Sequence, residues 1–192
     1  MDAFLLSFVI IFLAEMGDKS QLMALAFATR YRAATVLIAV TVATLLVHAG
    51  SVIVGAAFAM ALPTDAIQIG AGVAFLGFAA WTLRGDEFGE EDEERANRSG
   101  RWALITIGTA FFLAELGDKT MLATITLATT EEPWGTWLGS TLGMVAADAI
   151  AIAIGAVLGT RLPERYIKLF AAGAFVLFGM LLIAEASASC SR

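Results

Sequence analysis

The chain has 192 residues, of which 59% are apolar and 16% are charged, and its formal net charge is −6. A soluble domain of this size carries roughly a quarter charged residues, so this composition excludes an ordinary soluble domain. Its one cysteine, Cys190, excludes an internal disulfide framework and a cysteine-based metal site. Much of the negative charge lies in residues 86–94, a run that indicates a solvated linker rather than a charged binding face.

Six long apolar runs follow one another along the chain. Each approaches or exceeds the ~18–20 residues that cross a bilayer as a helix. Their length, without period-two alternation, favours helices over strands. The sequence therefore predicts an all-α integral membrane protein with six transmembrane helices, at residues 4–28, 33–61, 66–83, 102–129, 134–160 and 166–185.

The first run carries charges at the depth of the bilayer centre. It has no basic n-region and no small-residue cleavage site, so we expect a retained span rather than a cleaved signal peptide. Glu15 lies about 16 Å into this span at ~1.5 Å per residue. Asp18 follows three residues later, and a continuous helix would put both acids on one face.

Neighbours of these acids supply further polar groups. Ser20 offers a hydroxyl oxygen, and Gln21 is spaced to share the face of Asp18. Gly17 allows either close helix approach or a local break that frees backbone carbonyls. Lys19 is spaced for an ion pair with Glu15 in the same helix.

The second run contains the single histidine of the chain, His48. Two interpretations remain open for it: a proton relay, or a packed, neutral histidine bonded to a carbonyl. The third run ends at the acidic segment, and we expect residues 84–101 to form a charged cytoplasmic linker between two halves.

The fourth run repeats the first at an offset of one hundred residues. Residues 112–120 read F-L-A-E-L-G-D-K-T, and residues 12–20 read F-L-A-E-M-G-D-K-S, so seven of nine positions are identical. The offset continues without a gap, since Leu62-Pro63 matches Leu162-Pro163 and Phe75 matches Phe175. The similarity predicts a duplicated chain. Its second copy supplies Glu115, Gly117, Asp118, Lys119 and Thr120, with Met121 in place of Gln21.

The fifth run holds Asp148, at the position that matches His48. A lone aspartate among apolar residues at membrane depth needs a partner, so we expect a metal-binding or proton-coupling role. The sixth run closes the second repeat.

Three spans per repeat make successive repeats enter the membrane from opposite sides. Nine arginines and lysines fall on one predicted face, and the opposite face carries only Arg192. Because basic residues mark the cytoplasmic side, both termini are expected outside the cytoplasm. We therefore expect inverted three-helix repeats at residues 1–83 and 102–192. The nine residues are Arg30, Arg32, Arg84, Arg95, Arg98, Arg101, Arg161, Arg165 and Lys168.

Inverted repeats commonly hold their substrate at the midplane between the two halves. The pairs Glu15 with Asp18 and Glu115 with Asp118 would then converge as an all-oxygen site, which suits hard divalent cations. The alternative is two internal ion pairs, Glu15–Lys19 and Glu115–Lys119. Both hold together if Lys19 and Lys119 act as tethered counter-charges.

The segments E-M-G-D-K-S and E-L-G-D-K-T match the signature E-x-G-D-[KR]-[ST]. Two copies in a chain of six spans resemble the cation exchanger family of the Golgi calcium/manganese transporters and bacterial manganese exporters. The resemblance implies that Glu15, Asp18, Glu115 and Asp118 bind the cation. It implies Mn²⁺ and Ca²⁺ as transported substrates rather than cofactors, and proton antiport as the coupling.

The expected function is therefore export of divalent cations across the inner (plasma) membrane, in exchange for protons. A passive channel and a membrane enzyme using the paired carboxylates are the alternatives. No nucleotide loop, nucleophile–base pair or zinc spacing occurs in the sequence, so neither an enzyme nor a nucleic-acid partner is expected. Association with further copies of the chain stays open.

Overall fold

The computed structural model of the protein describes residues 2–28, 31–84, 103–158 and 164–190. These residues form eight α-helices and, within those ranges, no strand. The predicted all-helical fold is thus confirmed, and the helices follow the six apolar runs. They are α1 (Ala3–Glu15), α2 (Lys19–Ala28), α3 (Ala33–Ala61), α4 (Thr64–Arg84), α6 (Ala103–Glu115), α7 (Lys119–Thr130), α8 (Pro133–Leu158) and α9 (Glu164–Cys190).

Run length predicted one helix for the first apolar run and one for the fourth. In the structure, neither of these runs is a continuous helix. Each is broken in the middle, between α1 and α2 and between α6 and α7. Gly17 and Gly117 cause the breaks, because their φ angles of 77° and 83° lie in the left-handed region that other residues rarely adopt. Of the two roles expected for these glycines, the local break is therefore confirmed.

The distribution of polarity is that of a membrane protein. On α3, Ile53 and Met60 are 70% and 85% exposed, whereas His48 and Ser51 are fully buried. Water would favour the opposite arrangement, and large apolar surfaces of this kind mark contact with lipid or with other proteins. Within the described part, α3, α4 and residues Pro133–Ala153 of α8 are long and apolar enough to cross a membrane.

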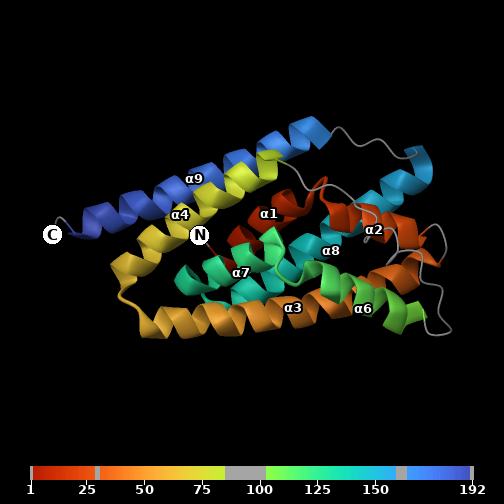
Figure 1. The fold of residues 1–192 in the computed structure, drawn as a ribbon, viewed down its shortest axis with the longest axis horizontal. Helices are drawn as coiled ribbons and strands as arrows, with labels where there is room; N and C mark the ends of the chain where they lie inside the picture. Colours follow the sequence, from red (N-terminus) through yellow and green to blue (C-terminus); the bar gives the residue numbers. More distant parts are fainter. Residues whose placement is uncertain (1, 29–30, 85–102, 159–163, 191–192) are drawn as a thin grey trace.

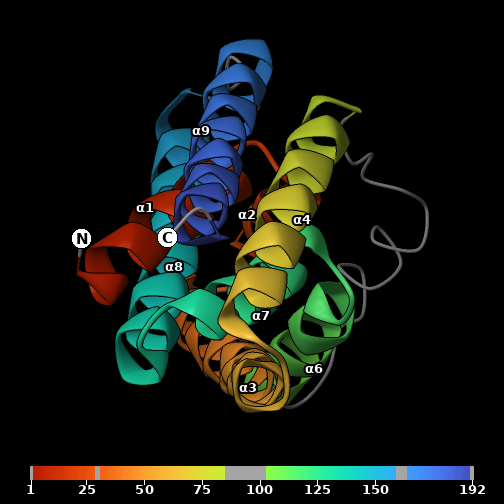
Figure 2. The ribbon, with the colours of Figure 1, turned by 90° about the vertical axis from the view of Figure 1, so that its left-hand side faces the viewer.

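Corresponding helices of the two repeats pack reciprocally on each other (Figures 1 and 2). Helix α1 packs on α8 and its counterpart α6 packs on α3, while α4 packs on its own counterpart α9. Equivalent residues meet between α4 and α9, and also between α3 and its counterpart α8. The rings of Phe75 and Phe175 are 5.8 Å apart between centroids, and the Thr44 hydroxyl lies 3.5 Å from the Met144 sulfur. The repeats therefore share one core rather than forming separate bundles.

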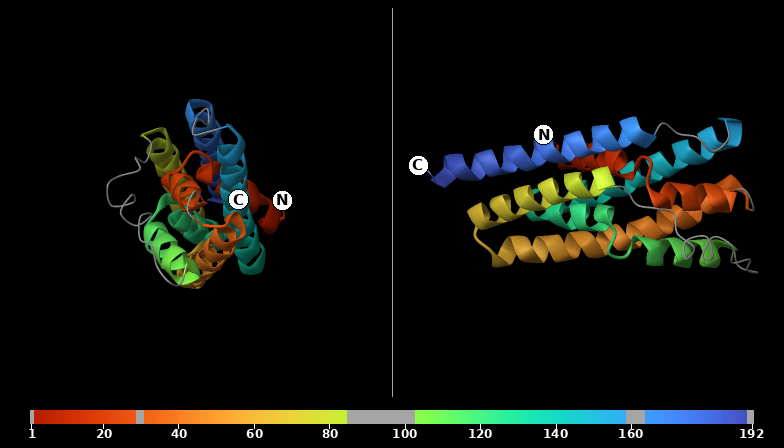
Figure 3. Two further views of the ribbon diagram at one scale, coloured as in Figure 1. Left: turned by 90° about the vertical axis from the view of Figure 1, so that its right-hand side faces the viewer. Right: turned by 45° about the horizontal axis from the view of Figure 1, so that its top comes forward.

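The ends of the helices divide between the two ends of the molecule. The C-terminus and the connection from α3 to α4 lie toward the left of Figure 1, with the N-terminus a little left of the centre, and a second view agrees (Figure 3). The starts of α3 and α6 lie toward the right, and the end of α4 lies near the middle of the view. Most of the expected linker, residues 85–101, lies outside the described residues, as do Arg30 and Arg161.

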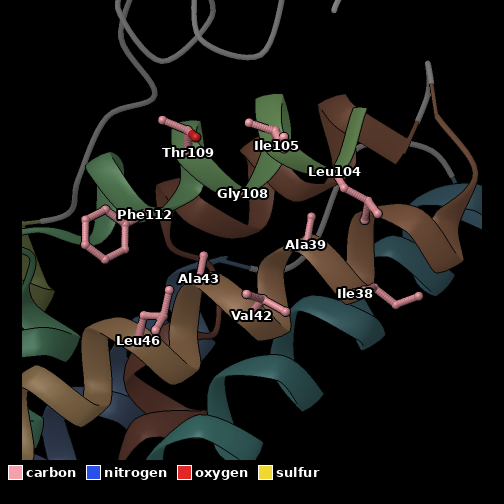
Figure 4. A pocket seen from close by; sticks show the side chains of 10 residues that line it. All are labelled: Ile38, Ala39, Val42, Ala43, Leu46, Leu104, Ile105, Gly108, Thr109 and Phe112. Carbon is pink, nitrogen blue, oxygen red and sulfur yellow. The ribbon is translucent and has the colours of Figure 1, made fainter. Parts of the chain in front are cut away.

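The two equivalent packing surfaces, α1 on α8 and α6 on α3, differ in closeness. Gly139 and Gly143 of α8 lie so near the backbone of α1 that a Cβ at Gly143 would come within 2.6 Å of the Phe8 oxygen. Between α3 and α6 there is instead an apolar groove of about 460 Å³, shown in Figure 4. Its lining includes Ile38 and Val42 of α3 and Ile105 of α6. The residue of α3 that corresponds to Gly139 is Ala39, which lines this groove.

Candidate cation site at the helix breaks

Four buried carboxylates flank the two breaks. Glu15 ends α1 and Asp18 directly precedes α2, and Glu115 and Asp118 take the same places between α6 and α7. The backbone turns between them, with the amide of Asp18 donating to the Glu15 carbonyl at 3.0 Å. The expectation that each pair shares one helix face is therefore wrong, because the left-handed glycine interrupts the helix before the aspartate.

The broken helices place backbone dipoles at the same sites. Asp118 is the N-cap residue of α7, with extended backbone (φ −73°, ψ 166°) and no side-chain capping hydrogen bond. Helix N-termini favour negative side chains, and helix C-termini such as those of α1 and α6 favour cations. A break thus presents an aspartate and the carbonyl end of a helix within a few residues, which is how discontinuous helices hold ions within membranes.

Ser20 and Thr120 orient the two glutamates. The Ser20 hydroxyl donates to Glu15 Oε1, and the Thr120 hydroxyl donates to Glu115 Oε2 at 3.1 Å. The remaining oxygens, Glu15 Oε2 and Glu115 Oε1, are buried and have no hydrogen-bond partner among the described residues. Both hydroxyls expected from the sequence therefore reach the acids, and each leaves one glutamate oxygen available.

Lys19 and Lys119 pair with the aspartates of the opposite repeat. The Lys119 ammonium lies 2.8 Å from Asp18 Oδ1, and the Lys19 ammonium lies 3.2 Å from Asp118 Oδ1. The ion pairs expected within each helix, Glu15–Lys19 and Glu115–Lys119, are thus replaced by pairs between repeats. The i,i+4 rule holds only along an unbroken helix, and the glycine break removes that condition.

Gln21 stabilises the first break. Its Oε1 accepts the Gly17 amide at 2.8 Å, and its Nε2 donates to the Ala147 carbonyl of α8 at 2.9 Å. The Met121 sulfur lies 3.1 Å from the Gly117 amide at the second break. Gln21 and Met121 therefore contact the equivalent glycine amides of the two repeats, a shared role that sequence spacing did not suggest.

Asp148 interacts with the acids at the helix breaks, whereas His48 makes no hydrogen bond among the described residues. Asp148 is fully buried, and neither of its oxygens has a hydrogen-bond partner within the described ranges. It interacts electrostatically with Asp18, Glu15 and Glu115. His48 is also fully buried, and neither ring nitrogen has a partner among the residues described, so no bond to a carbonyl is seen.

The charges of this region do not balance. Five acids, all at most 3% exposed, face two lysines, and Glu15 and Glu115 repel each other across the repeats. The acids are Glu15, Asp18, Glu115, Asp118 and Asp148, which we call the acidic cluster. In the described part of the chain, no three His, Cys, Asp or Glu side chains are grouped as ligands of one metal ion. In this conformation each of the two aspartates forms an ion pair with a lysine.

A helical membrane protein that buries an excess of carboxylates at two helix breaks has the features of an ion transporter. Comparison with known proteins agrees. Residues 3–90 and 103–189 match the family described as "Divalent cation/proton antiporter GDT1". The chain belongs to this family, which consists of transporters, and it transports cations across a membrane.

Individual relatives resemble the chain over nearly its whole length. A Vibrio cholerae protein provisionally named a manganese exporter is 34% identical over 183 residues, which are 94% of this chain and 90% of that protein. A GDT1-like protein of Synechocystis is 30% identical over 94% of this chain and 96% of its own length. The chloroplast protein PAM71 of Arabidopsis thaliana is 30% identical over 96% of this chain, which is 57% of the longer plant protein. No solved structure shows a significant match.

Proposed function

We propose that the protein exports a hard divalent cation, Mn²⁺ and/or Ca²⁺, from the cytoplasm in exchange for protons. The description of the family names divalent cations and protons, and the name of the Vibrio cholerae relative refers to manganese export. The observation that carries the proposal is the buried group of four carboxylates, two at each helix break, that the two repeats contribute in equivalent positions.

Glu15, Asp18, Glu115 and Asp118 are the proposed ligands. Carboxylate oxygens suit hard cations, and Mn²⁺ and Ca²⁺ both accept several of them. Glu15 Oε2 and Glu115 Oε1 are the oxygens that the neighbouring hydroxyls leave without a hydrogen bond within the described residues. Asp148 adds a fifth acid that interacts with Asp18, and we propose it as an additional ligand or proton acceptor.

The proposed architecture has six spans in two inverted repeats, residues 1–83 and 102–192, joined by a cytoplasmic linker at 84–101. In it, α1 with α2 and α6 with α7 form the broken spans. The matching breaks, the reciprocal packing of corresponding helices and the position of both termini in the same half of the molecule support this arrangement. The asymmetry of basic residues supports the plasma membrane orientation with both termini outside the cytoplasm.

Exchange follows from competition for the same oxygens. If all were ionised, five buried acids with two lysines would leave excess negative charge in a region of low dielectric, where uncompensated charge is costly. Either a divalent cation or protons can provide the missing positive charge. A cation that enters from the cytoplasm would displace protons, and protons that enter from outside would displace the cation.

Metal flux in proteoliposomes tests the proposal. The purified protein is reconstituted, an ionophore clamps the voltage, and Mn²⁺ and Ca²⁺ fluxes are measured under imposed pH gradients, with Mg²⁺ for comparison. Acid on the external side is expected to drive metal outward, and acid on the cytoplasmic side to slow it. Metal flux that ignores the size and direction of the gradient would contradict antiport and favour a channel or uniporter.

A further inference from the structure

The two lysines beside the acidic cluster form ion pairs that the duplicated sequence does not predict. Each lysine follows the aspartate of its own repeat, yet it pairs with the aspartate of the other repeat. The pairs are reciprocal, Lys119 with Asp18 and Lys19 with Asp118. They join the start of α2 to the start of α7, at the two helix breaks where the proposed cation ligands lie.

An ammonium group and a divalent cation that share one carboxylate oxygen repel each other strongly, because two positive charges then lie within a few ångströms. Asp18 Oδ1 lies 2.8 Å from the Lys119 ammonium, so a cation that binds this oxygen repels the lysine and favours its withdrawal. Lysine is suited to this exchange, because its charge sits on a flexible four-carbon stem and no planar fork fixes its direction.

From these contacts we infer that Lys19 and Lys119 are tethered counter-cations that compete with the transported cation for Asp18 and Asp118. In the empty transporter each lysine neutralises a buried aspartate, which would otherwise be destabilising. When cargo binds, both lysines withdraw and the ion pairs between repeats open. When cargo leaves, the lysines return to the aspartates, so they favour its release. The lysines stay charged throughout.

This inference rests on the proposed function, since it assumes that the aspartates bind the cargo. It adds a link between cargo and conformation, because the pairs that break are contacts between the two repeats. Cation binding would therefore free the repeats to move relative to each other. The two pairs differ in burial: Lys119 is 5% exposed and Lys19 is 23% exposed, so Lys119 is expected to have the larger effect.

Two substitutions at Lys119 test the inference in opposite directions. Lys119→Met keeps the four-atom stem of the side chain and removes the competing ammonium, so equilibrium Mn²⁺ binding is expected to tighten by about tenfold. Lys119→Arg keeps the charge and adds a fork that holds carboxylates more firmly, so Mn²⁺ binding is expected to weaken. Binding is measured on purified protein in lipid nanodiscs.

Maximal Mn²⁺ flux in proteoliposomes provides the second measurement. Lys119→Met is expected to lower the maximal flux while it tightens binding, because slower release accompanies tighter binding. A merely structural lysine would lower the folded amount and leave the affinity of the folded fraction unchanged. Lys19→Met and Lys19→Arg are the matched variants in the other repeat, and smaller shifts of the same sign are expected.

The outcomes separate this inference from the proposed function. If the wild-type protein neither binds nor transports Mn²⁺ or Ca²⁺, the proposed function fails and the inference fails with it. If the wild-type protein binds and transports, but both Lys119 variants keep wild-type affinity, only the inference is overturned. Should Lys119→Met not fold, Lys119→Arg decides alone: weaker Mn²⁺ binding supports competition, and unchanged or tighter binding rejects it.

Discussion

Gly139 of α8 lies directly against the backbone of Phe4 in α1. A Cβ at this glycine would come within 3.0 Å of the Phe4 carbonyl carbon and closer still to its oxygen. At the related packing surface of α6 on α3, Gly108 faces the carbonyl of Ala39, the residue that corresponds to Gly139, and a Cβ on Gly108 would lie 3.6 Å from that oxygen. The two related surfaces thus differ in closeness, and α8 carries Gly139 where α3 carries Ala39.

Gly139→Ala is expected to destabilise the protein by about 1–3 kcal/mol, because overpacking against backbone forces α1 and α8 apart. Thermal unfolding of the purified protein in detergent measures the effect. Gly108→Ala is the matched control and is expected to be neutral or stabilising. Its Cβ would make an ordinary van der Waals contact with α3, and alanine favours the helix more than glycine does. Equal destabilisation by both substitutions would contradict the difference in packing.

Gly117→Ala is expected to destabilise the protein by about 1–3 kcal/mol for a purely conformational reason. Its φ of +83° is strained for alanine, yet a Cβ there would meet no atom within 4 Å. Gly77→Ala in the interior of α4 is the control, because a Cβ there also meets nothing and alanine favours helix. The comparison uses thermal unfolding and Mn²⁺ flux. A Gly117→Ala variant as stable and active as the control would show that the break does not need this glycine.

Neutral substitutions of the four proposed ligands are expected to abolish transport without preventing folding. The variants are Glu15→Gln, Asp18→Asn, Glu115→Gln and Asp118→Asn, and each removes a buried charge that the cation would use. Asp65→Asn, at an exposed position in the first turn of α4, is the control and should transport normally. Mn²⁺ flux and gel-filtration profiles are measured together. Normal flux in three of the four variants would reject a shared site.

The proposed orientation predicts which loops an impermeant thiol reagent reaches in intact cells. In a Cys190→Ser background, Asp65→Cys is expected to label from outside. Glu91→Cys, in the acidic linker, should label only after the membrane is opened. The physical reason is the concentration of arginines within the linker, at positions 84, 95, 98 and 101, which favours the cytoplasmic side. Labelling of Glu91→Cys in intact cells would reverse the orientation.

The sequence alone determined the helical class, the duplication and the residues of the acidic cluster. Seven identical positions in nine, at an offset of one hundred residues, reveal the repeat without any structure. Run length and composition likewise predict α3 at residues 33–61, where the structure has Ala33–Ala61. These features are readable because each depends on residues that are neighbours in the chain.

Only the tertiary structure decided how those residues meet. The sequence offered Glu15 as the partner of Lys19 by helical spacing, and the fold gives it Asp118 instead. It also offered two roles for Gly17, and the φ of 77° selects the break. The reason is physical: a local pattern assumes a continuous helix, whereas the break and the packing of α2 and α7 against the opposite repeat set distances between residues one hundred positions apart.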